Sequence, residues 1–367
     1  MNLPFKPYLN ISSKYKGGKG KSDVQSLIPG KKIYKLSSNE NMLGSSPLAV
    51  EAIIEATKDL LYYPERTDKN IRLALEDFYK GVIPEDLFLC ANSGMELLDM
   101  ICRAFLNEGE NGIACAPAFR AYKLFTKRTG AELINVPLKE GSYELDVDGI
   151  LDAINEKTRI IFLNSPNNPT GTIIPDSDIR KLLERLSKDI VVVLDEVYFH
   201  FNTNEACTTA YTFIKEGFPV IGVNSFSKCF GLAGLRVGYL YSTPEITQYL
   251  RGLQRPFQLS HLSMIGAIAA LGDDDFIQKT VELVNSEKPK IYAALEELGV
   301  QYWKSEANFI MIKPTMPAEE FERAMLMEGV MVRPVENFGA PGCIRVSIGT
   351  VEANEAYISA LIKVLNG

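Results

Sequence analysis

The chain has 367 residues, of which 46% are hydrophobic and 23% charged, and its 39 Lys and Arg residues stand against 46 Asp and Glu residues. Such a composition is typical of a packed globular protein and excludes a largely disordered chain, while the length predicts two domains. The net charge of −7 argues against a general nucleic-acid binder, and the two histidines, His200 and His261, argue against a multi-histidine metal site or a histidine-driven triad.

The sequence predicts a cytoplasmic protein. No apolar stretch typical of an export signal follows Met1, and no apolar run reaches the length of a membrane span. The six cysteines form no C-x-x-C pair, and several lie in apolar runs. This pattern predicts free, buried thiols in a reducing compartment. We expect no membrane or nucleic-acid partner and no metal.

Residues 12–35 are rich in Lys, Gly and Ser, and their lack of periodicity predicts a mobile N-terminal arm. The run 17–22 approaches a phosphate-binding loop, but Tyr15 stands where that motif needs its first glycine. From about residue 48, helix and strand patterns alternate. We expect helices at 48–61, 71–79, 95–105, 178–187, 280–298 and 318–327, and strands at 87–91, 112–115, 132–137, 158–163, 190–194, 220–224, 236–240, 308–312 and 343–348.

The predicted strands are short and rich in Ile and Val, which is typical of a sheet buried on both faces. Such sheets are mostly parallel and are covered by helices. We therefore predict an α/β fold, with a mostly parallel central sheet in a large domain of residues 48–255. The later pattern predicts a smaller α+β domain of residues 256–367, and we expect the arm, residues 1–47, to pack with it.

Several polar segments follow predicted strands, at the sheet edge where α/β folds bind ligands. Asn92 and Ser93 open a helix, so they can hold a phosphate, although ordinary helix capping explains the same residues. Residues 164–171 (NSPNNPTG) form a rigid polar turn that presents asparagine side chains, although such a turn can also be a simple connector.

Two charged residues also follow predicted strands. Asp195 comes after four buried aliphatic residues, so it needs a cationic or N–H partner, which a bound heterocycle or the start of the next segment would supply. Lys228 lies between a strand and a Gly-rich turn. Most lysines are solvated surface residues, but one in this place can be desolvated, lose its proton and form a Schiff base.

In this order the segments resemble the fold-type I pyridoxal-phosphate enzymes, in particular the class I/II aminotransferases. The shared motifs are Asn-Pro-Thr-Gly at 168–171, Asp-x-x-Tyr at 195–198 and Ser-x-Ser-Lys-x(7)-Arg at 225–236. Within the class, the L-x-x-N-E-N motif at 36–41, Tyr-Pro-Glu at 63–65 and the ending at 344–350 are most similar to the histidinol-phosphate aminotransferases.

The resemblance implies pyridoxal 5′-phosphate as the cofactor and gives roles to individual residues. Lys228 would form the Schiff base and shuttle the proton, and Asp195 would pair with the protonated ring nitrogen. Tyr198 and Asn168 would bind the 3′ oxygen of the cofactor. Phe119 would stack on the ring, at a position where many relatives have Tyr.

The resemblance also implies a phosphate site and a shared active site. The cofactor phosphate would be held by Asn92, Ser93, Ser225, Ser227 and Arg236. Tyr63 matches a tyrosine that reaches the phosphate in the neighbouring subunit, which implies a homodimer.

For the substrates, an amino donor and a 2-oxo acid, the resemblance implies carboxylate and phosphate contacts. Arg345 would clamp a carboxylate, although a strand-edge arginine in a surface ion pair is the ordinary alternative. Arg333 would meet a distal phosphate. Asn41 lies near the substrate entrance, where residues 41–44 read Asn-Met-Leu-Gly in place of the more usual Asn-Pro-x-Gly.

The implied reaction is the transamination of histidinol phosphate and 2-oxoglutarate to imidazole-acetol phosphate and glutamate, a step of histidine biosynthesis. Two enzymatic alternatives remain, an aromatic amino acid aminotransferase and a pyridoxal-phosphate-dependent decarboxylase of a phosphorylated amino acid. A third alternative, a cofactor-binding regulator fused to a DNA-binding module, requires more than the 47 or so unpatterned residues that precede the domain.

Overall fold

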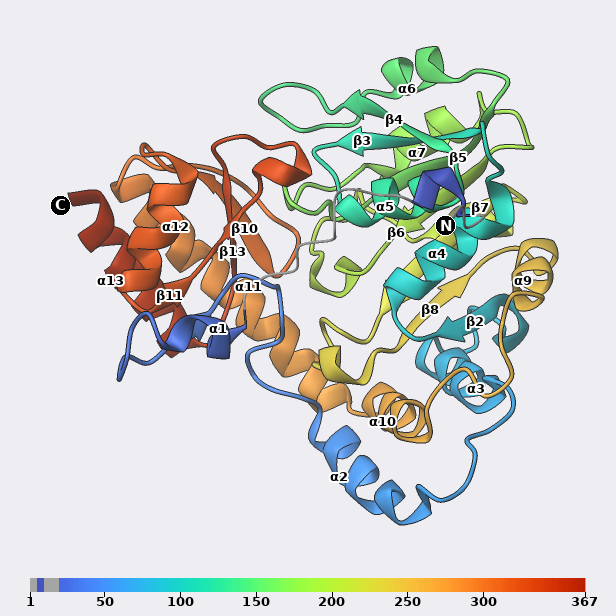
Figure 1. Cartoon of the computed structure of the whole chain (residues 1–367), viewed down its shortest axis with the longest axis horizontal. Helices are drawn as coiled ribbons and strands as arrows, with labels where there is room; N and C mark the ends of the chain where they lie inside the picture. Colours follow the sequence, from blue (N-terminus) through green and yellow to red (C-terminus); the bar gives the residue numbers. More distant parts are fainter. Residues whose placement is uncertain (1–4, 10–19, 367) are drawn as a thin grey trace.

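The computed structural model describes residues 5–9 and 20–366, so residues 1–4 and 10–19 of the predicted arm lie outside it. Its centre is a seven-stranded sheet in the order β2-β8-β7-β6-β5-β3-β4 (Figure 1). Strand β8 is antiparallel to both neighbours and the other pairs are parallel, which confirms the predicted α/β fold. The strands are β2 (Phe88–Ala91), β3 (Asn111–Ala116), β4 (Glu132–Pro137), β5 (Thr158–Asn164), β6 (Val191–Asp195), β7 (Val220–Ser225) and β8 (Gly238–Tyr241).

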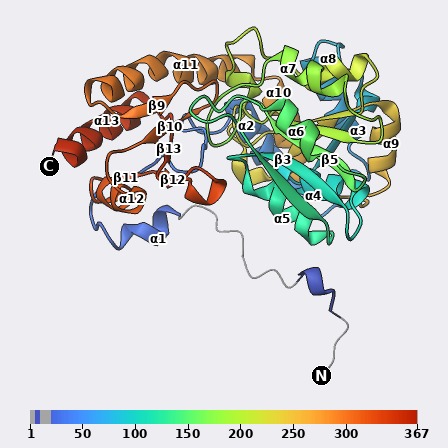
Figure 2. The same cartoon turned by 90° about the horizontal axis from the view of Figure 1, so that it is seen from above.

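Helices cover both faces of this sheet because the strands alternate their apolar side chains. In β6, Val191 and Val193 belong to one buried cluster, and Val192 and Leu194 belong to another. Figure 2 shows α4 and α5 on one side of the sheet and α7 and α8 on the other. The first cluster includes residues of α4 (Gly94–Phe105), α5 (Arg120–Arg128) and α9 (Pro244–Arg251). The second includes residues of α2 (Pro47–Ala56), α3 (Lys69–Phe78), α6 (Val147–Ala153), α7 (Asp176–Leu183), α8 (Ala210–Lys215) and α10 (His261–Leu271).

The C-terminal segment forms a second, antiparallel sheet in the order β12-β13-β10-β9. The long helix α11 runs between this sheet and α10 (Figure 1). It begins six residues before the predicted start because Asp273 caps it there, with its side chain accepting the Phe276 N–H. The elements are α11 (Asp274–Glu297), β9 (Gln301–Trp303), β10 (Phe309–Lys313), α12 (Ala318–Met327), β12 (Arg333–Pro334), β13 (Ile344–Ser347) and α13 (Val351–Asn366).

The described parts of the arm pack in different places: residues 5–9 contact α5, whereas Val24, Ile28 and Ile33 are buried against Leu326 and Met331 of the C-terminal segment. The prediction of a mobile arm is therefore wrong for residues 24–35, because these apolar side chains are buried. β1 (Tyr34–Lys35) pairs in parallel with β11 (Val330–Met331), and α1 (Lys21–Gln25) precedes it. Helix α10 packs on α2 and α3, although the predicted boundary assigns it to the small domain, and the domain bounds remain a prediction. The short 3₁₀ helices are η1 (Pro7–Leu9), η2 (Thr57–Asp59), η3 (Glu85–Leu87), η4 (Phe199–Phe201), η5 (Ala233–Leu235) and η6 (Glu336–Phe338).

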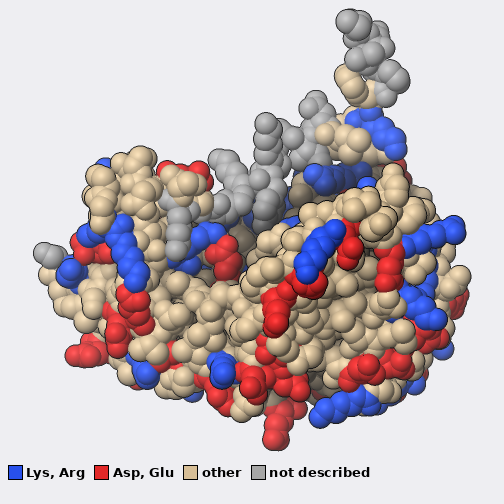
Figure 3. All heavy atoms as spheres, turned by 90° about the horizontal axis from the view of Figure 1, so that it is seen from below, with Lys and Arg blue, Asp and Glu red and all other residues tan. Residues whose placement is uncertain are grey.

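One predicted strand starts later than expected. Arg236 has φ 56°, in the left-handed region, so it cannot extend the strand, and β8 begins at Gly238. All six cysteines are buried and free, as predicted. Within the described ranges, no helix is long and apolar enough to cross a membrane. On the face shown in Figure 3, basic and acidic side chains are interspersed, so no large area carries one sign.

Candidate active site

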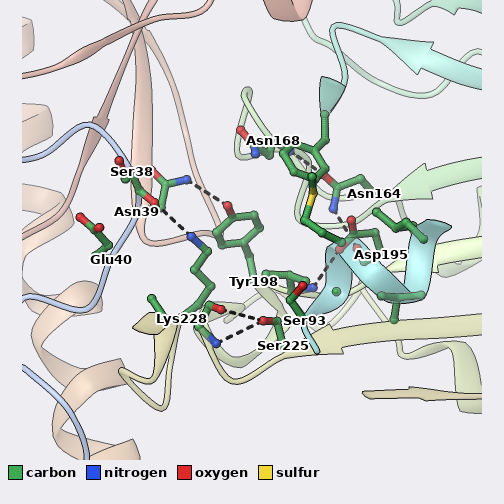
Figure 4. Close-up of a pocket in the computed structure, with 18 of the residues that line it drawn as sticks. Ser38, Asn39, Glu40, Ser93, Asn164, Asn168, Asp195, Tyr198, Ser225 and Lys228 are labelled. Atoms are coloured by element: carbon green, nitrogen blue, oxygen red, sulfur yellow. Dashed lines mark hydrogen bonds between the residues drawn. The ribbon is translucent and has the colours of Figure 1, made fainter. Parts of the chain in front are cut away.

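A cavity of about 250 Å³ lies beyond the carboxyl ends of β5, β6 and β7 (Figure 4). This is the sheet edge at which α/β folds bind ligands. Its lining combines residues of the central sheet with residues of the arm and of the C-terminal sheet. The predicted site residues that line it are Ser93, Phe119, Asn168, Asp195, Tyr198, Ser225, Ser227, Lys228, Arg236, Arg333 and Arg345.

Lys228 follows β7, and its side chain points into the cavity (Figure 4). Its Nζ donates a hydrogen bond to the Ser38 carbonyl oxygen over 3.0 Å and lies 5.7 Å from the centre of the Tyr198 ring. Burial lowers the pKa of Lys228 to about 7, and the positive charge of Arg345 acts in the same direction. A large fraction of this amine is therefore unprotonated at neutral pH, as a nucleophilic lysine requires.

Asp195 is the last residue of β6, beside Asn164 at the end of β5. The Tyr122 hydroxyl donates to its Oδ2 over 2.8 Å, and the Val197 N–H donates to its Oδ1 over 3.3 Å. Burial raises the pKa of Asp195 to about 6, against the lowering effect of these two donors. Both donors are neutral, so a cationic ring nitrogen would be a favourable partner for this buried carboxylate.

The other end of the cavity is rich in hydrogen-bond donors. Ser225 and Ser227 are linked by a hydroxyl–hydroxyl bond of 3.1 Å, and Arg236 Nη1 donates to Ser227 Oγ over 3.4 Å. Ser93 precedes the N-terminus of α4, whose backbone N–H groups favour an anion. Gly238 permits the close approach of β8 here, because a Cβ at this residue would lie 2.5 Å from the backbone nitrogen of Gly94.

Two arginines of the C-terminal sheet also line the cavity. Arg333 in β12 and Arg345 in β13 are direct partners across the antiparallel ladder. Arg345 donates to Asn168 Oδ1 over 2.6 Å and to the Ser37 carbonyl oxygen over 2.9 Å. These bonds orient its planar fork of donors, which suits a carboxylate or a phosphate.

Three predicted residues do not line the cavity. Asn92 donates through its side chain to the Gln258 carbonyl oxygen, and Asn41 donates to the Cys229 carbonyl oxygen and to Thr280. Tyr63 is 86% exposed in the single chain. Its role in a neighbouring subunit remains a prediction.

The structure adds residues to which the sequence reasoning gave no role. Residues 37–40 line the cavity, and two of their carbonyl oxygens accept bonds from Lys228 and Arg345. The L-x-x-N-E-N motif at 36–41 contains this whole segment, but a backbone carbonyl leaves no signal in a side-chain pattern. Tyr122 could have been sought as a donor, because a buried Asp195 needs one.

The residues that are present fit pyridoxal phosphate. The buried carboxylate of Asp195 suits the ring nitrogen, the serine hydroxyls and Arg236 suit the phosphate, and the Lys228 amine lines the same cavity. Phe119 provides an aromatic wall. Among the described residues, no group of three or more His, Cys, Asp or Glu side chains could hold a metal ion.

The chain belongs to the aminotransferase class I and II family, whose model matches residues 31–361. This result confirms the predicted class, a pyridoxal-phosphate-dependent aminotransferase of fold type I. The chain is 35% identical to the histidinol-phosphate aminotransferase of Halalkalibacterium halodurans, over 99% of this chain and 97% of that protein. It is 36% identical to histidinol-phosphate aminotransferase 1 of Dechloromonas aromatica, over 98% of each chain. The predicted likeness to this group is thereby confirmed.

The fold is also found in solved structures. The histidinol-phosphate aminotransferase of Sinorhizobium meliloti in complex with pyridoxal-5′-phosphate superposes with a TM-score of 0.87 and 23% identity, covering 99% of this chain and 98% of that chain. The aspartate aminotransferase of Thermotoga maritima gives a TM-score of 0.82 and 21% identity, covering 92% and 93%. The fold alone therefore does not select the substrate.

Proposed function

We propose that the chain transfers the amino group of histidinol phosphate to 2-oxoglutarate, giving imidazole-acetol phosphate and glutamate. The observation that carries this proposal is one cavity that combines Lys228 and Asp195 with the paired arginines Arg333 and Arg345. The full-length similarity to histidinol-phosphate aminotransferases supports the choice of substrate. Histidinol phosphate has no carboxylate, so the two arginines would meet its phosphate in one half-reaction and the carboxylates of glutamate in the other.

The residues of the cavity have distinct roles in this reaction. When bound, pyridoxal phosphate supplies an electron sink for the carbon that loses its proton. Lys228 binds the cofactor and moves the proton between two carbon atoms, for which its lowered pKa suits it. Asp195 keeps the ring nitrogen protonated. Tyr198 and Asn168 would bind the 3′ oxygen of the cofactor, and Phe119 would provide an apolar wall for its ring.

The phosphate end of the cavity has its own group of residues in this proposal. Ser225, Ser227 and Arg236 form a bonded set of donors, and Ser93 adds the start of α4. Asn92 is assigned to the same end, although its amide donates to Gln258 in the single chain. Asn41 is assigned to the substrate entrance.

We also propose a homodimer with a shared active site in the cytoplasm. The segment 60–63 exposes four large apolar or aromatic side chains, which a second subunit would cover. Tyr63 belongs to this segment and would reach the phosphate of the partner subunit's cofactor. Six free, buried thiols support a reducing compartment.

A panel of amino donors tests the substrate. We expect the highest kcat/KM with histidinol phosphate and 2-oxoglutarate, measured as glutamate formed. Strong turnover of phenylalanine or tyrosine without histidinol phosphate would instead identify an aromatic aminotransferase. Release of CO₂ without a keto product would identify the decarboxylase.

The cofactor is tested separately, by the visible absorbance of the purified protein. Lys228→Ala should remove the lysine-dependent band, while Lys188→Ala, on an exposed loop, should retain it. An identical spectrum in Lys228→Ala would refute the assignment of Lys228. Sedimentation analysis tests the dimer, and a stable monomer with full activity would refute the shared site.

A further inference from the structure

Asn39 lies where the arm, the C-terminal sheet and the loop after β6 meet, and its side chain points at Tyr198 (Figure 4). The residue is 1% exposed and has φ 56°, in the left-handed region. Among residues other than glycine, Asn and Asp tolerate this conformation best. Asn39 therefore holds this buried conformation at little steric cost.

Hydrogen bonds to the C-terminal segment fix the orientation of the Asn39 amide. The Asn39 backbone N–H donates to Ser347 Oγ over 2.8 Å, and Ser347 Oγ in turn donates to Asn39 Oδ1 over 3.1 Å. The Asn308 side chain donates to the Asn39 carbonyl oxygen over 3.1 Å. Because Oδ1 accepts the Ser347 hydroxyl, Nδ2 is the atom that faces Tyr198, and it donates to Tyr198 Oη over 3.0 Å.

The direction of this last bond has a chemical consequence. A tyrosine hydroxyl has one hydrogen, and its oxygen can also accept a bond. Because Tyr198 Oη accepts from Asn39, the hydrogen of Tyr198 is directed away from the Asn39 amide. Tyr198 lines the cavity, so an acceptor bound there can receive this hydrogen.

We propose that Asn39 is a positioning residue that sets the hydrogen-bond polarity of Tyr198, so that this hydroxyl donates to the 3′ oxygen of the cofactor. The inference rests on the proposed function, in which Tyr198 binds that oxygen. Asn39 acts through Tyr198, and Ser347 acts through Asn39. Because Ser347 belongs to β13, the polarity of Tyr198 depends on the docking of the arm and the C-terminal sheet.

The test measures the pH dependence of the visible absorbance of the cofactor-loaded enzyme. A donor to the 3′ oxygen favours the unprotonated form of the bound cofactor and so lowers its pKa. Asn39→Asp keeps the size and the positive φ, but an ionised carboxylate only accepts, so Tyr198 would donate to it. We expect the pKa of the bound cofactor to rise by about one pH unit, the value of one hydrogen bond.

A second background separates this effect from the charge of the new carboxylate. In a Tyr198→Phe background, Asn39→Asp should give only the smaller shift that is due to charge. Equal shifts in the two backgrounds would overturn the proposal. Ser347→Ala gives a neutral variant in case Asn39→Asp does not fold. This variant removes the hydroxyl that orients the Asn39 amide, without adding charge. The pKa of the bound cofactor should then rise by less than in Asn39→Asp, and an unchanged pKa would overturn the proposal.

Two controls distinguish a failure of the role proposed for Asn39 from a failure of the proposed function. Asn111→Asp places the same change at another buried asparagine, at the start of β3 and outside the cavity, and should leave the cofactor pKa unchanged. Absence of any Lys228-dependent absorbance in the wild-type protein would refute the proposed function itself. An unchanged pKa in Asn39→Asp, in a protein that shows this absorbance, refutes only the role of Asn39.

Discussion

Arg345 donates a hydrogen bond of 2.6 Å to the amide oxygen of Asn168 and thereby joins β13 to the turn after β5. The amide oxygen of Asn168 is thus occupied by a guanidinium, which leaves its amide nitrogen as the group that can donate to a ligand. The proposed carboxylate site and the proposed cofactor site share this one side chain.

Arg345→Lys should reduce kcat/KM for 2-oxoglutarate and glutamate by about a hundredfold, mostly through KM, because lysine keeps the charge but loses the paired donors. Steady-state kinetics with each substrate measures the change. The absorbance of the bound cofactor serves as the control and should be retained. An unaltered KM for the dicarboxylates would contradict the role of Arg345.

Tyr122→Phe should weaken the binding of the cofactor about tenfold, because it removes a neutral donor from the buried carboxylate of Asp195. The ring, which stacks on Phe162 at a centroid distance of 4.9 Å, is kept. Titration of the cofactor-free protein with pyridoxal phosphate measures the affinity. Tyr357→Phe is the matched control, since Tyr357 is also buried but its hydroxyl has no hydrogen-bond partner among the described residues. Equal affinities in the two variants would contradict the prediction.

The rate at which the cofactor-free enzyme captures pyridoxal phosphate should rise with pH through about 7 and level off near pH 8. The reason is the pKa of Lys228, which burial lowers to about 7, because only the unprotonated amine attacks an aldehyde. Stopped-flow absorbance measures the rate. A rate that still climbs at pH 9 to 10, as for an ordinary lysine, would show that Lys228 is not desolvated.

Glu196→Gln should stabilise the protein increasingly as the pH rises from about 5 to about 8. Burial raises the pKa of Glu196 to about 8, although the Tyr241 hydroxyl donates to it. Between these two pH values, Glu196 is protonated in the folded state but ionised in the unfolded state, where its pKa is the ordinary 4.5. The free energy of unfolding of the wild type therefore falls as the pH rises, by at most about 1.4 kcal/mol per pH unit.

Urea unfolding at several pH values measures this difference. Glutamine mimics the protonated side chain, so the variant should lose the fall in stability. Glu205→Gln, at an exposed position, is the control and should follow the wild type. Parallel curves for Glu196→Gln and wild type would show that Glu196 is ionised in the folded protein.

The sequence predicted the strands and the charged groups of the site for a physical reason. Buried strands need continuous aliphatic runs, and a polar residue directly after such a run, as Asp195 is, stands out. The prediction gives the bounds of β4 (Glu132–Pro137) to the residue and places a helix near α12 (Ala318–Met327).

Short elements and backbone contacts were missed. β1 and β11 have two residues each, too few to show a periodicity, and they exist because they pair with one another. The carbonyl oxygens of Ser37 and Ser38 accept from charged residues far along the chain, and no local pattern encodes such a contact. The start of β8 was misplaced because the left-handed conformation of Arg236 depends on its surroundings.

The bond between Ser37 and Arg345 joins residues 308 positions apart. During synthesis on a ribosome, Ser37 is added early, but Arg345, which donates to its carbonyl oxygen, is added only when almost the entire chain has been made. Closing so long a loop is a late and slow event in folding. The carboxylate site that contains Arg345 is therefore completed late, and proteins truncated before β13 should lack this site even where the central sheet has formed.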